Sequence, residues 1–491
     1  MKPMKIKALM ALTVSLAAIA GTTDGIAQQK MRSISQSAAS QAAQQHPQIV
    51  AEFGGEEDGA RGAYVRNVGV RVANQSNING GGNAFRITTL NSPVMNAFAV
   101  PGGYLYVTRQ LLGLMNDEAE LASVLGHEAG HIAARHSQER QRTGLLSQLG
   151  ALLVGVVTGS GQLAQIAQQG AQLYTLKYSR SQELEADDLG VRYMAAAGYD
   201  PAASANMLAS LGTWTDLETR LQGREQDQRA APSWARTHPL SAERVQRSTA
   251  QAQRTGRVGQ GIRNRDQHLQ AVNGMIFDDD PAQGIVEGRE FLHPDLRVAF
   301  TVPQGFGIQN GTRAVAVIGS SGQAQFTTGP FSGNLDTYIG EAFRSIGGEQ
   351  AQIQYSRPQH TTINGIEAAY STARAQTQSG VVDVTVVAYA FDNSHAYHFV
   401  TVTRAGTGLG ALSPMVQSVR RLSAQQAAAI RPRVIQVVTV GANDTVQSLA
   451  SRMAYPDYQM ERFRALNGLG ANGTVQRGQR LKVVVYGQRR T

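Results

Sequence analysis

The sequence predicts an α+β chain of several domains: a mainly helical core with a small edge sheet, an antiparallel β-rich α+β domain, and a small β-α-α-β unit near the C-terminus. Three observations predict this order. Apolar residues recur at helical spacing around 117–136 and 177–194, they alternate with a period of two from about 285 to 425, and residues 434–487 read as strand, helix, helix, strand. The length of the chain is consistent with two to four domains.

Residues 1–27 have the pattern of a signal peptide. A basic start, "MKPMKIK", precedes the apolar run "ALMALTVSLAAIA", and the small residues that follow suit cleavage after Ala20 or Ala27. The chain has no cysteine, so we expect neither disulfides nor an acylated N-terminal cysteine. The expected location is therefore the bacterial periplasm, reached by export and without lipidation.

Residues 96–103, "NAFAVPGG", predict a strand that borders a cleft. Their residues alternate, and Pro101-Gly102-Gly103 marks a turn. Such an edge can hold an extended peptide by backbone pairing. The alternative is an ordinary core hairpin.

Residues 126–136, "GHEAGHIAARH", continue a helix that starts near 117. At about 100° per residue, His127 and His131 lie about 40° apart, so both imidazoles leave the same face, with Glu128 beside them. His136 falls about 180° from His127 on an unbroken helix and is not expected to be a ligand.

This H-E-x-x-H spacing is typical of a catalytic zinc site. Two neutral imidazoles and a third protein ligand hold the ion, and a fourth position stays open for water. The metal lowers the pKa of that water, and the glutamate takes its proton. We therefore expect one Zn²⁺ per chain. The alternative is a solvated polar helix face.

The third ligand has to come from another helix. The motif with a further glycine and histidine is excluded, because Ala134 and Ser137 occupy those positions. Residues 177–194, "KYSRSQELEADDLGVRYM", predict a helix on which Glu183 and Asp187 share one face.

Glu183 is the expected zinc ligand on this helix, and Asp187 is expected to hydrogen-bond a ligand histidine. Gly190 lies on the same face and would permit close approach of the two helices. Glu185 and Asp188 point away from that face, and we expect both to contact solvent.

Four segments in order carry a family resemblance: "NAFAVPGGYLYVTRQLL" (96–112), "HEAGH" (127–131), "SRSQELEADDLG" (179–190) and "THPLSAERV" (237–245). Over roughly residues 60–250 the chain resembles the gluzincin family of HtpX-like, BepA-like and CAAX-prenyl proteases. The resemblance implies that the helical core is a gluzincin protease. It also implies the roles of individual residues, which are zinc ligation by His127, His131 and Glu183, general base for Glu128, and support of the ligands by Asp187.

The resemblance gives roles to four further residues. Asn96 and Ala97 would lie nearest the bound peptide. His238 would close over the zinc as a fourth ligand in the manner of the BepA-like branch; the alternatives are helix capping and substrate contact. Arg244 is expected to pair with a carboxylate of the site.

No membrane span and no nucleic-acid partner are expected. The stretch 145–159, "LLSQLGALLVGVVTG", is shorter than the roughly eighteen residues of a spanning helix. We expect a buried or interfacial helix there, and peripheral membrane contact is the alternative. The formal charge of +9 includes the basic leader, and the remaining arginines are scattered.

The expected domains are a zinc metalloprotease at 28–260, a linker at 261–284, and a β-rich α+β domain at 285–425. Within 28–48 the sequence suggests a loosely held helix or tail. In the β-rich part, "DNSH" (392–395) predicts a hairpin turn, and "SPMVQSVRRL" (413–422) predicts a helix. No catalytic pattern occurs there, so we expect a docking or regulatory role.

Residues 434–487 resemble a LysM domain, a β-α-α-β unit that binds glycans such as peptidoglycan. The resemblance places a glycan groove between the loops around Asp444 and Thr445 and around Asn467. "MAYPDYQMERFRAL" departs from the usual short connection. Protein docking or a structural role is therefore the alternative.

Together these patterns predict a periplasmic zinc endopeptidase that cleaves protein substrates in envelope quality control. Two other classes remain open. One is an adaptor that binds the cell wall and whose protease core is inactive. The other is a chaperone-like holdase that uses the cleft with the latch shut.

Overall fold

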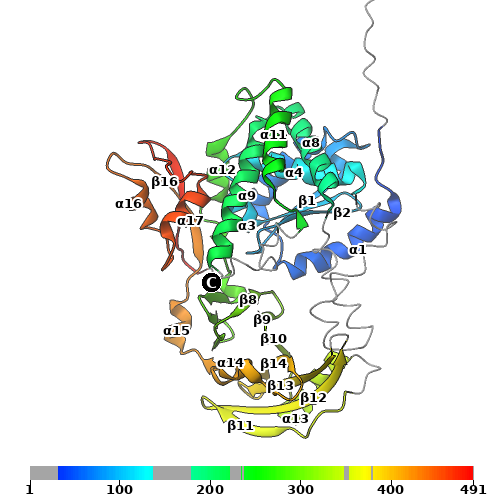
Figure 1. Cartoon of the computed structure of the whole chain (residues 1–491), viewed down its shortest axis with the longest axis vertical. Coiled ribbons are helices and arrows are strands. Elements are labelled where there is room, and N and C mark those ends of the chain that lie inside the picture. The colour runs from blue at the N-terminus through cyan, green and yellow to red at the C-terminus, as the bar shows by residue number, and fades with distance from the viewer. Residues whose placement is uncertain are drawn as a thin grey trace, which may run out of the picture.

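The structure, a computed structural model, describes residues 31–136, 178–221, 234, 237–347, 353–377 and 380–489. The expected signal peptide and the apolar stretch 145–159 lie outside the described residues. Figure 1 shows the helical part beside the C-terminal strands and helices, with the β-rich part at the opposite end of the molecule. Of the helices in the described ranges, none is both long and apolar enough to cross a membrane.

A three-stranded sheet lies in the helical part. β3 (Tyr104–Thr108) pairs in parallel with β1 (Arg86–Leu90) and antiparallel with β2 (Ala97–Val100). The segment predicted to be a strand is thus the edge strand β2, whose four residues are all buried and which forms a hairpin with β3. Between β2 and β3, Gly102 and Gly103 have φ values of 111° and 87°, which glycine adopts without strain. The edge strand leads directly into this turn.

Helices cover both faces of this sheet. Successive strand residues alternate between faces, so Phe98 and Tyr106 point to one side and Ala97, Leu105 and Val107 to the other. The first side packs against α1 (Gln36–Glu52), which is a firmly packed helix, whereas a loosely held helix or tail was expected. The second side belongs to the main core, which includes α2 (Gly59–Ala73) and α4 (Glu118–Ala134).

The helices α4 and α8 (Arg180–Ala196) approach each other through glycines. A methyl group at Gly190 would lie 2.9 Å from the backbone nitrogen of His127, and one at Gly126 would lie 3.1 Å from the carbonyl oxygen of Gly190. The close approach predicted for Gly190 is confirmed. The remaining helices of this part are α3 (Arg109–Leu114), α9 (Ala202–Leu221), α11 (Ala242–Arg254) and α12 (Arg265–Val272).

The β-rich part contains a seven-stranded antiparallel sheet. Its order is β11 (Gln359–Ile363), β12 (Ile366–Thr377), β13 (Gly380–Ala390), β14 (His395–Arg404), β10 (Gly322–Pro330), β9 (Val315–Gly319), β8 (Phe306–Asn310). α13 (Leu335–Gly347) packs on this sheet. The predicted change to a period of two, and with it an α+β chain with antiparallel sheets, is confirmed.

A four-stranded sheet in the order β15 (Arg420–Arg421), β7 (Val298–Thr301), β6 (Glu290–His293), β5 (Ile285–Glu287) completes this part. The helix expected over 413–422 is wrong in its second half. α14 (Ser413–Gln417) ends early, because Arg420 and Arg421 pair with Ala299 and Val298 of β7. Backbone pairing with a distant strand outweighs the local helical pattern.

The C-terminal residues form β16 (Arg433–Thr439), α16 (Val446–Ala450), α17 (Gln459–Leu466) and β17 (Arg480–Tyr486), in the predicted order. α15 (Ala424–Ala429) precedes them. β4 (Ile276–Phe277), in the stretch expected to be a linker, pairs with β16 as a third strand. This C-terminal unit shares the core of the helical part, to which it contributes Ile435, Leu449, Phe463 and Leu481.

Lys482 fixes this contact. Its side chain is fully buried, and Nζ donates to the carbonyl oxygens of Gly113, Leu114 and Met115 at 2.7, 2.9 and 2.6 Å. These carbonyls end α3, where no helical N–H is available to them. A cation from β17 therefore caps a helix of the other unit.

Candidate metal centre

Four buried side chains bring their ligand atoms within 4.8 Å of one another: His127, His131, Glu183 and His238. The Nε2 atoms of His127 and His131 lie 3.0 Å apart, and Glu183 oxygens lie 3.6 Å from each of them. Nδ1 of His238 lies 3.4 Å from Nε2 of His127 and 2.9 Å from Oε1 of Glu183. The ligands come from α4, α8 and the segment before α11.

These distances fit a zinc ion. Bonds of about 2.0–2.2 Å in tetrahedral geometry place neighbouring ligand atoms roughly 3.3 Å apart. In five of the six pairs of these side chains the ligand atoms lie 2.9 to 3.6 Å apart, a range that includes that value. Three imidazoles and a carboxylate are also donors that zinc prefers. The residues present therefore fit the metal that the sequence pattern predicts.

Asp187 supports His127 from the side away from the cluster. Its Oδ1 lies 2.9 Å from Nδ1 of His127, which leaves Nε2 directed at the other ligands. Burial lowers the pKa of His127, but the hydrogen bond and charge of Asp187 outweigh it, so the pKa is raised.

Arg244 joins the two carboxylates of α8. It donates from Nε and Nη2 to both oxygens of Asp187, each at 2.7 Å, and its Nη1 lies 2.8 Å from Oε2 of Glu183. Burial raises the pKa of Asp187, but the bonds from Arg244 and His127 outweigh it and hold the pKa below its usual range. Arg244 thus pairs with a site carboxylate.

His136 is not among the four clustered side chains, but the unbroken helix assumed from the sequence does not continue through it. α4 ends at Ala134, and Arg135 adopts the left-handed conformation with φ 60°, which turns the chain back. As a result, Nδ1 of His136 lies 2.8 Å from Nδ1 of His131. Tyr178 stacks on the His131 ring at 3.6 Å and 18°. The helical wheel gave no signal for either contact.

Glu128 lies beside the cluster with its carboxylate fully buried. Neither oxygen has a hydrogen-bond partner within the described ranges, and Nε2 of His238 is 3.6 Å from Oε1. Burial raises the pKa of Glu128. A buried carboxylate without a partner costs free energy, so its retention beside a metal cluster points to a chemical role.

Trp234 connects His238 to the edge strand. Its backbone N–H donates to the carbonyl of Met95 at 3.2 Å, and its backbone carbonyl accepts from the backbone N–H of His238 at 2.7 Å. The two rings stack with centroids 4.3 Å apart. The sequence contained no distinctive signal for this tryptophan beyond its place in a polar stretch.

Asn96 and Ala97 are both fully buried at the start of β2. The backbone of Asn96 pairs with Thr108, but neither side-chain atom of Asn96 has a partner within the described ranges. An amide that is buried and unpaired at a sheet edge is unusual. Asn96 directly follows Met95, whose carbonyl accepts the backbone hydrogen bond from Trp234.

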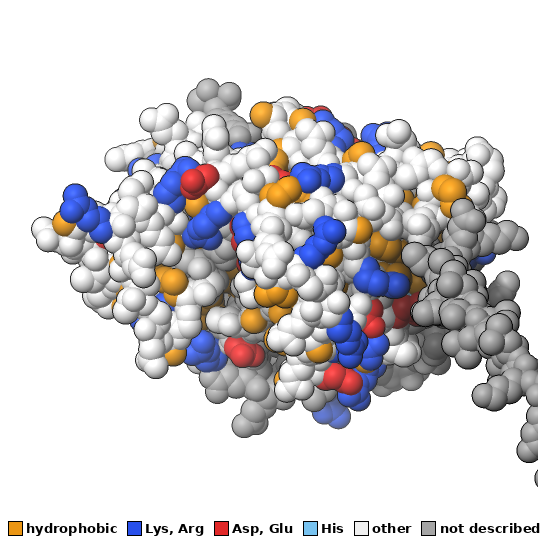
Figure 2. Space-filling model, turned by 90° about the horizontal axis from the view of Figure 1, so that it is seen from above, with side chains coloured by type: hydrophobic (Ala, Val, Ile, Leu, Met, Phe, Trp, Pro, Cys, Tyr) orange, Lys and Arg blue, Asp and Glu red, His pale blue; other side chains and the backbone are white. Residues whose placement is uncertain are grey.

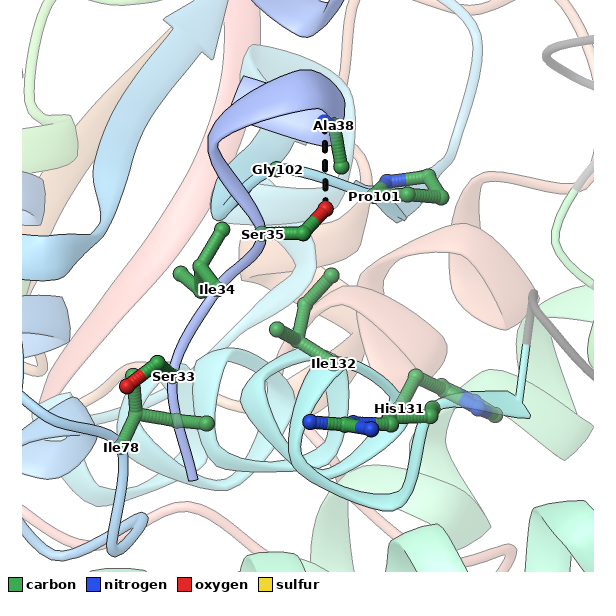
Figure 3. A pocket seen from close by; sticks show the side chains of 10 residues that line it. Ser33, Ile34, Ser35, Ala38, Ile78, Pro101, Gly102, His131 and Ile132 are labelled. Carbon is green, nitrogen blue, oxygen red and sulfur yellow. Dashed lines mark hydrogen bonds between the residues drawn. The ribbon is translucent and has the colours of Figure 1, made fainter. Parts of the chain in front are cut away.

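A hollow opens beside His131. It holds about 40 Å³ and is lined by the N-terminal segment 33–38, the turn 101–102 and the end of α4 at 131–135. Figure 3 shows Ile34 and Ile132 on opposite sides of it, with Ser35 capping the helix that carries Ala38. Arg32 donates to the carbonyl of Ala133, so the N-terminal segment is tied to α4.

The residues of the predicted glycan groove belong to the C-terminal unit. Asp444 accepts from the N–H of Gly441 at 2.7 Å, and Thr445 caps α16. Asn467 is buried, and its amide bonds the backbone of Phe463 and Lys482. The structure therefore gives Asn467 internal partners.

Basic side chains stand at several separate places on the face seen in Figure 2, among hydrophobic and uncharged side chains. This agrees with the scattered arginines of the sequence. The face offers no single charged surface.

Comparisons with known proteins agree with this site. The profile of Peptidase family M48 matches residues 60–252. "Mitochondrial metalloendopeptidase OMA1" of Arabidopsis thaliana is 33% identical over 132 residues, which are 27% of this chain and 26% of that protein. "Beta-barrel assembly-enhancing protease" of Yersinia pestis is 30% identical over 196 residues, 37% of each chain.

"Metalloprotease LoiP" of Escherichia coli (strain K12) is 32% identical over 155 residues, 31% of this chain and 56% of that protein. The chain thus spans a quarter to just over half the length of these relatives. The matched residues include α4, α8 and the start of α11, which hold the buried cluster. Residues 60–252, which carry the buried cluster, are therefore similar to the domain of Peptidase family M48.

Proposed function

We propose that the chain is a zinc-dependent endopeptidase that cleaves protein substrates in the bacterial periplasm. The observation that carries this proposal is the buried carboxylate of Glu128, which accepts no hydrogen bond within the described residues, beside the cluster of His127, His131 and Glu183. A purely structural zinc site has no use for such a carboxylate. The relatives named as metalloendopeptidases and proteases support it.

The reaction assigns one task to each group. His127, His131 and Glu183 would hold a zinc ion, which when bound would supply polarisation of the scissile carbonyl and a lowered pKa of water. Glu128 accepts a proton from the attacking water on a carboxylate oxygen and passes it to the nitrogen of the leaving amine. Asp187 keeps the proton of His127 on Nδ1, and Arg244 holds Asp187 and Glu183 in place.

The substrate would bind as an extended strand along β2. β2 is an edge strand, and the unpaired side chain of Asn96 offers both a donor and an acceptor to a peptide. The shallow hollow beside His131 would take a small apolar group of that peptide, between Ile34 and Ile132. Pairing through the backbone favours unfolded or extended protein segments over folded ones.

The arrangement of His238 and Trp234 supports a closed state. Nδ1 of His238 takes the fourth place of the cluster, where a catalytic site needs water. The backbone N–H of Trp234 donates a hydrogen bond to the carbonyl of Met95. A substrate strand would otherwise pair with that carbonyl. The segment therefore acts as a latch on both the metal and the edge strand.

The periplasmic location rests on the signal pattern in residues 1–27. A role in envelope protein quality control is suggested by the relative named for β-barrel assembly. Peptidoglycan contact would involve the loop of Asp444 and Thr445. Pull-down of the intact protein with and without Asp444→Ala on purified peptidoglycan tests that contact.

The test of the peptidase proposal is cleavage of casein by purified protein, with zinc content measured on the same samples. We expect cleavage that stops with a chelator, returns with Zn²⁺, and falls by about 10²–10⁴ in Glu128→Gln while zinc stays bound. The endopeptidase proposal would be refuted if the wild type binds one zinc per chain and neither the wild type nor His238→Ala cleaves casein.

A further inference from the structure

We propose that His136 is a positioning residue for the zinc ligand His131, and that Glu185 in turn orients His136. The proposal rests on the proposed zinc site and extends it to a pair of residues outside the four-ligand cluster. His136 is buried and lies just past the end of α4, while Glu185 lies on α8.

The geometry forms a chain of contacts that leads away from the metal cluster. Nδ1 of His136 lies 2.8 Å from Nδ1 of His131, and Nε2 of His136 lies 3.3 Å from Oε2 of Glu185. Gln182 also donates to the carbonyl of His136, at 3.5 Å. Two residues of α8 therefore hold His136 against the end of α4.

Zinc ligation fixes where the protons must lie. If Nε2 of His131 binds the metal, Nδ1 of His131 carries the proton and donates it. Nδ1 of His136 must then accept, so His136 carries its own proton on Nε2. That proton faces the carboxylate of Glu185, which accepts it. Each contact in the chain has one donor and one acceptor.

The two ligand histidines of α4 are thus supported by different means. His127 is backed by a buried carboxylate, Asp187, whereas His131 is backed by a neutral imidazole and, through it, an exposed carboxylate. Glu185 has a side chain 62% exposed, so water competes for its hydrogen bond. We therefore expect a large effect from His136 and a small one from Glu185.

The turn at Arg135 is the feature that makes this possible. If α4 continued through residue 136, the side chain of His136 would point to the side of the helix opposite His127. The left-handed φ of 60° at Arg135 instead ends α4 and returns His136 to its own helix.

The test compares two substitutions of nearly equal shape, His136→Asn and His136→Leu. The side-chain oxygen of Asn can accept from His131 where Nδ1 of His136 did, and Leu cannot. Glu185→Gln probes the outer contact, and Asp188→Asn is its control, because Asp188 lies on the same helix and pairs with Arg247 instead. Zinc affinity is measured by competition with a chelator. The absorption spectrum of the cobalt(II)-loaded protein and the thermal unfolding of the metal-free protein are recorded beside it.

We expect His136→Leu to weaken zinc binding about 10- to 100-fold and to change the cobalt spectrum. His136→Asn should keep affinity within a few fold of the wild type, Glu185→Gln should lower it a few fold, and Asp188→Asn should leave it unchanged. The proposal would be overturned if His136→Leu binds zinc as tightly as the wild type, or if His136→Asn and His136→Leu lose the same amount of zinc affinity. These measurements report metal binding and not cleavage. A protein that binds zinc but cleaves nothing would therefore refute the endopeptidase proposal without affecting the conclusion about His136.

Discussion

Arg244 and Asp187 form a buried two-point ion pair directly behind the metal cluster. Both oxygens of Asp187 accept from Arg244 at 2.7 Å, and both side chains are almost fully buried. The same guanidinium reaches Glu183. One arginine of α11 therefore positions two carboxylates of α8, the ligand itself and the support of His127.

Removing this arginine should damage both the fold and the site. Arg244→Leu leaves Asp187 with only one charged partner and Glu183 without its cation, and breaking a buried pair costs about 3–5 kcal/mol. We expect a loss of that order in the free energy of unfolding and weaker zinc binding, measured by denaturant titration and chelator competition.

The matched control for this change is Arg247→Leu, three residues further along α11. Arg247 pairs with Asp188, but its side chain is 46% exposed. An exposed pair contributes about 0–1 kcal/mol, so the variant should stay near the wild type. If both variants lose the same stability, the buried pair has no special role.

Close approach of α4 and α8 should depend on Gly190. A methyl group there would lie 2.9 Å from the backbone nitrogen of His127, so Gly190→Ala must push the helices apart. Overpacking of this kind costs about 1–3 kcal/mol, and we expect lower zinc affinity as well. Thermal unfolding and chelator competition measure the two effects.

Gly212→Ala in α9 provides the control for the added methyl group. Among the residues that the structure describes, nothing lies within 4 Å of a methyl group at that position. Alanine favours a helix interior over glycine by up to about 1 kcal/mol, so this variant should be as stable as the wild type or more so. Loss of zinc affinity in Gly212→Ala but not in Gly190→Ala would contradict the packing account.

Much of the site could be predicted because its chemistry is local. The four-residue spacing of His127 and His131 fixes their common face, and the same spacing fixes that of Glu183 and Asp187. We could predict that α4 and α8 meet because the two histidines of α4 need a third zinc ligand from another helix. Gly190 on the matching face already indicated how near they could come.

The remainder depends on backbone turns and distant contacts that periodicity does not encode. The left-handed Arg135 brings His136 to His131, and no residue type at that position announced it, since glycine is the usual choice. The pairing of β4 with β16 joins segments far apart in the chain. Lys482 is buried although lysine is usually exposed, so its role at α3 was not predicted.

Opening the latch should increase activity and weaken metal retention. His238→Ala removes the fourth ligand atom, and Trp234→Ala removes the ring that stacks on it. We expect higher basal casein cleavage in both variants but lower zinc affinity only in His238→Ala, because Trp234 does not ligate. Unchanged cleavage and unchanged zinc affinity in His238→Ala would count against the latch.

The C-terminal unit should unfold together with the protease domain. Lys482→Met keeps the length of the side chain but removes the donor to the buried carbonyls of Gly113, Leu114 and Met115. The carbonyl of Leu114 keeps a bond from Asn116 and that of Met115 keeps a bond from His268. We expect a loss of about 2–4 kcal/mol in the free energy of unfolding. Arg480→Met, on the same strand but paired at the surface with Asp266, should lose less than about 1 kcal/mol. A separate unfolding step for the C-terminal unit, unaffected by Lys482→Met, would contradict this picture.

The most direct test of the metal centre is the anomalous diffraction of a crystal of the zinc-loaded protein at the zinc absorption edge. The account predicts one peak per chain, about 2.0–2.2 Å from Nε2 of His127, Nε2 of His131 and a carboxylate oxygen of Glu183. A peak elsewhere, or one bound by the histidines with Glu183 turned away, would contradict it.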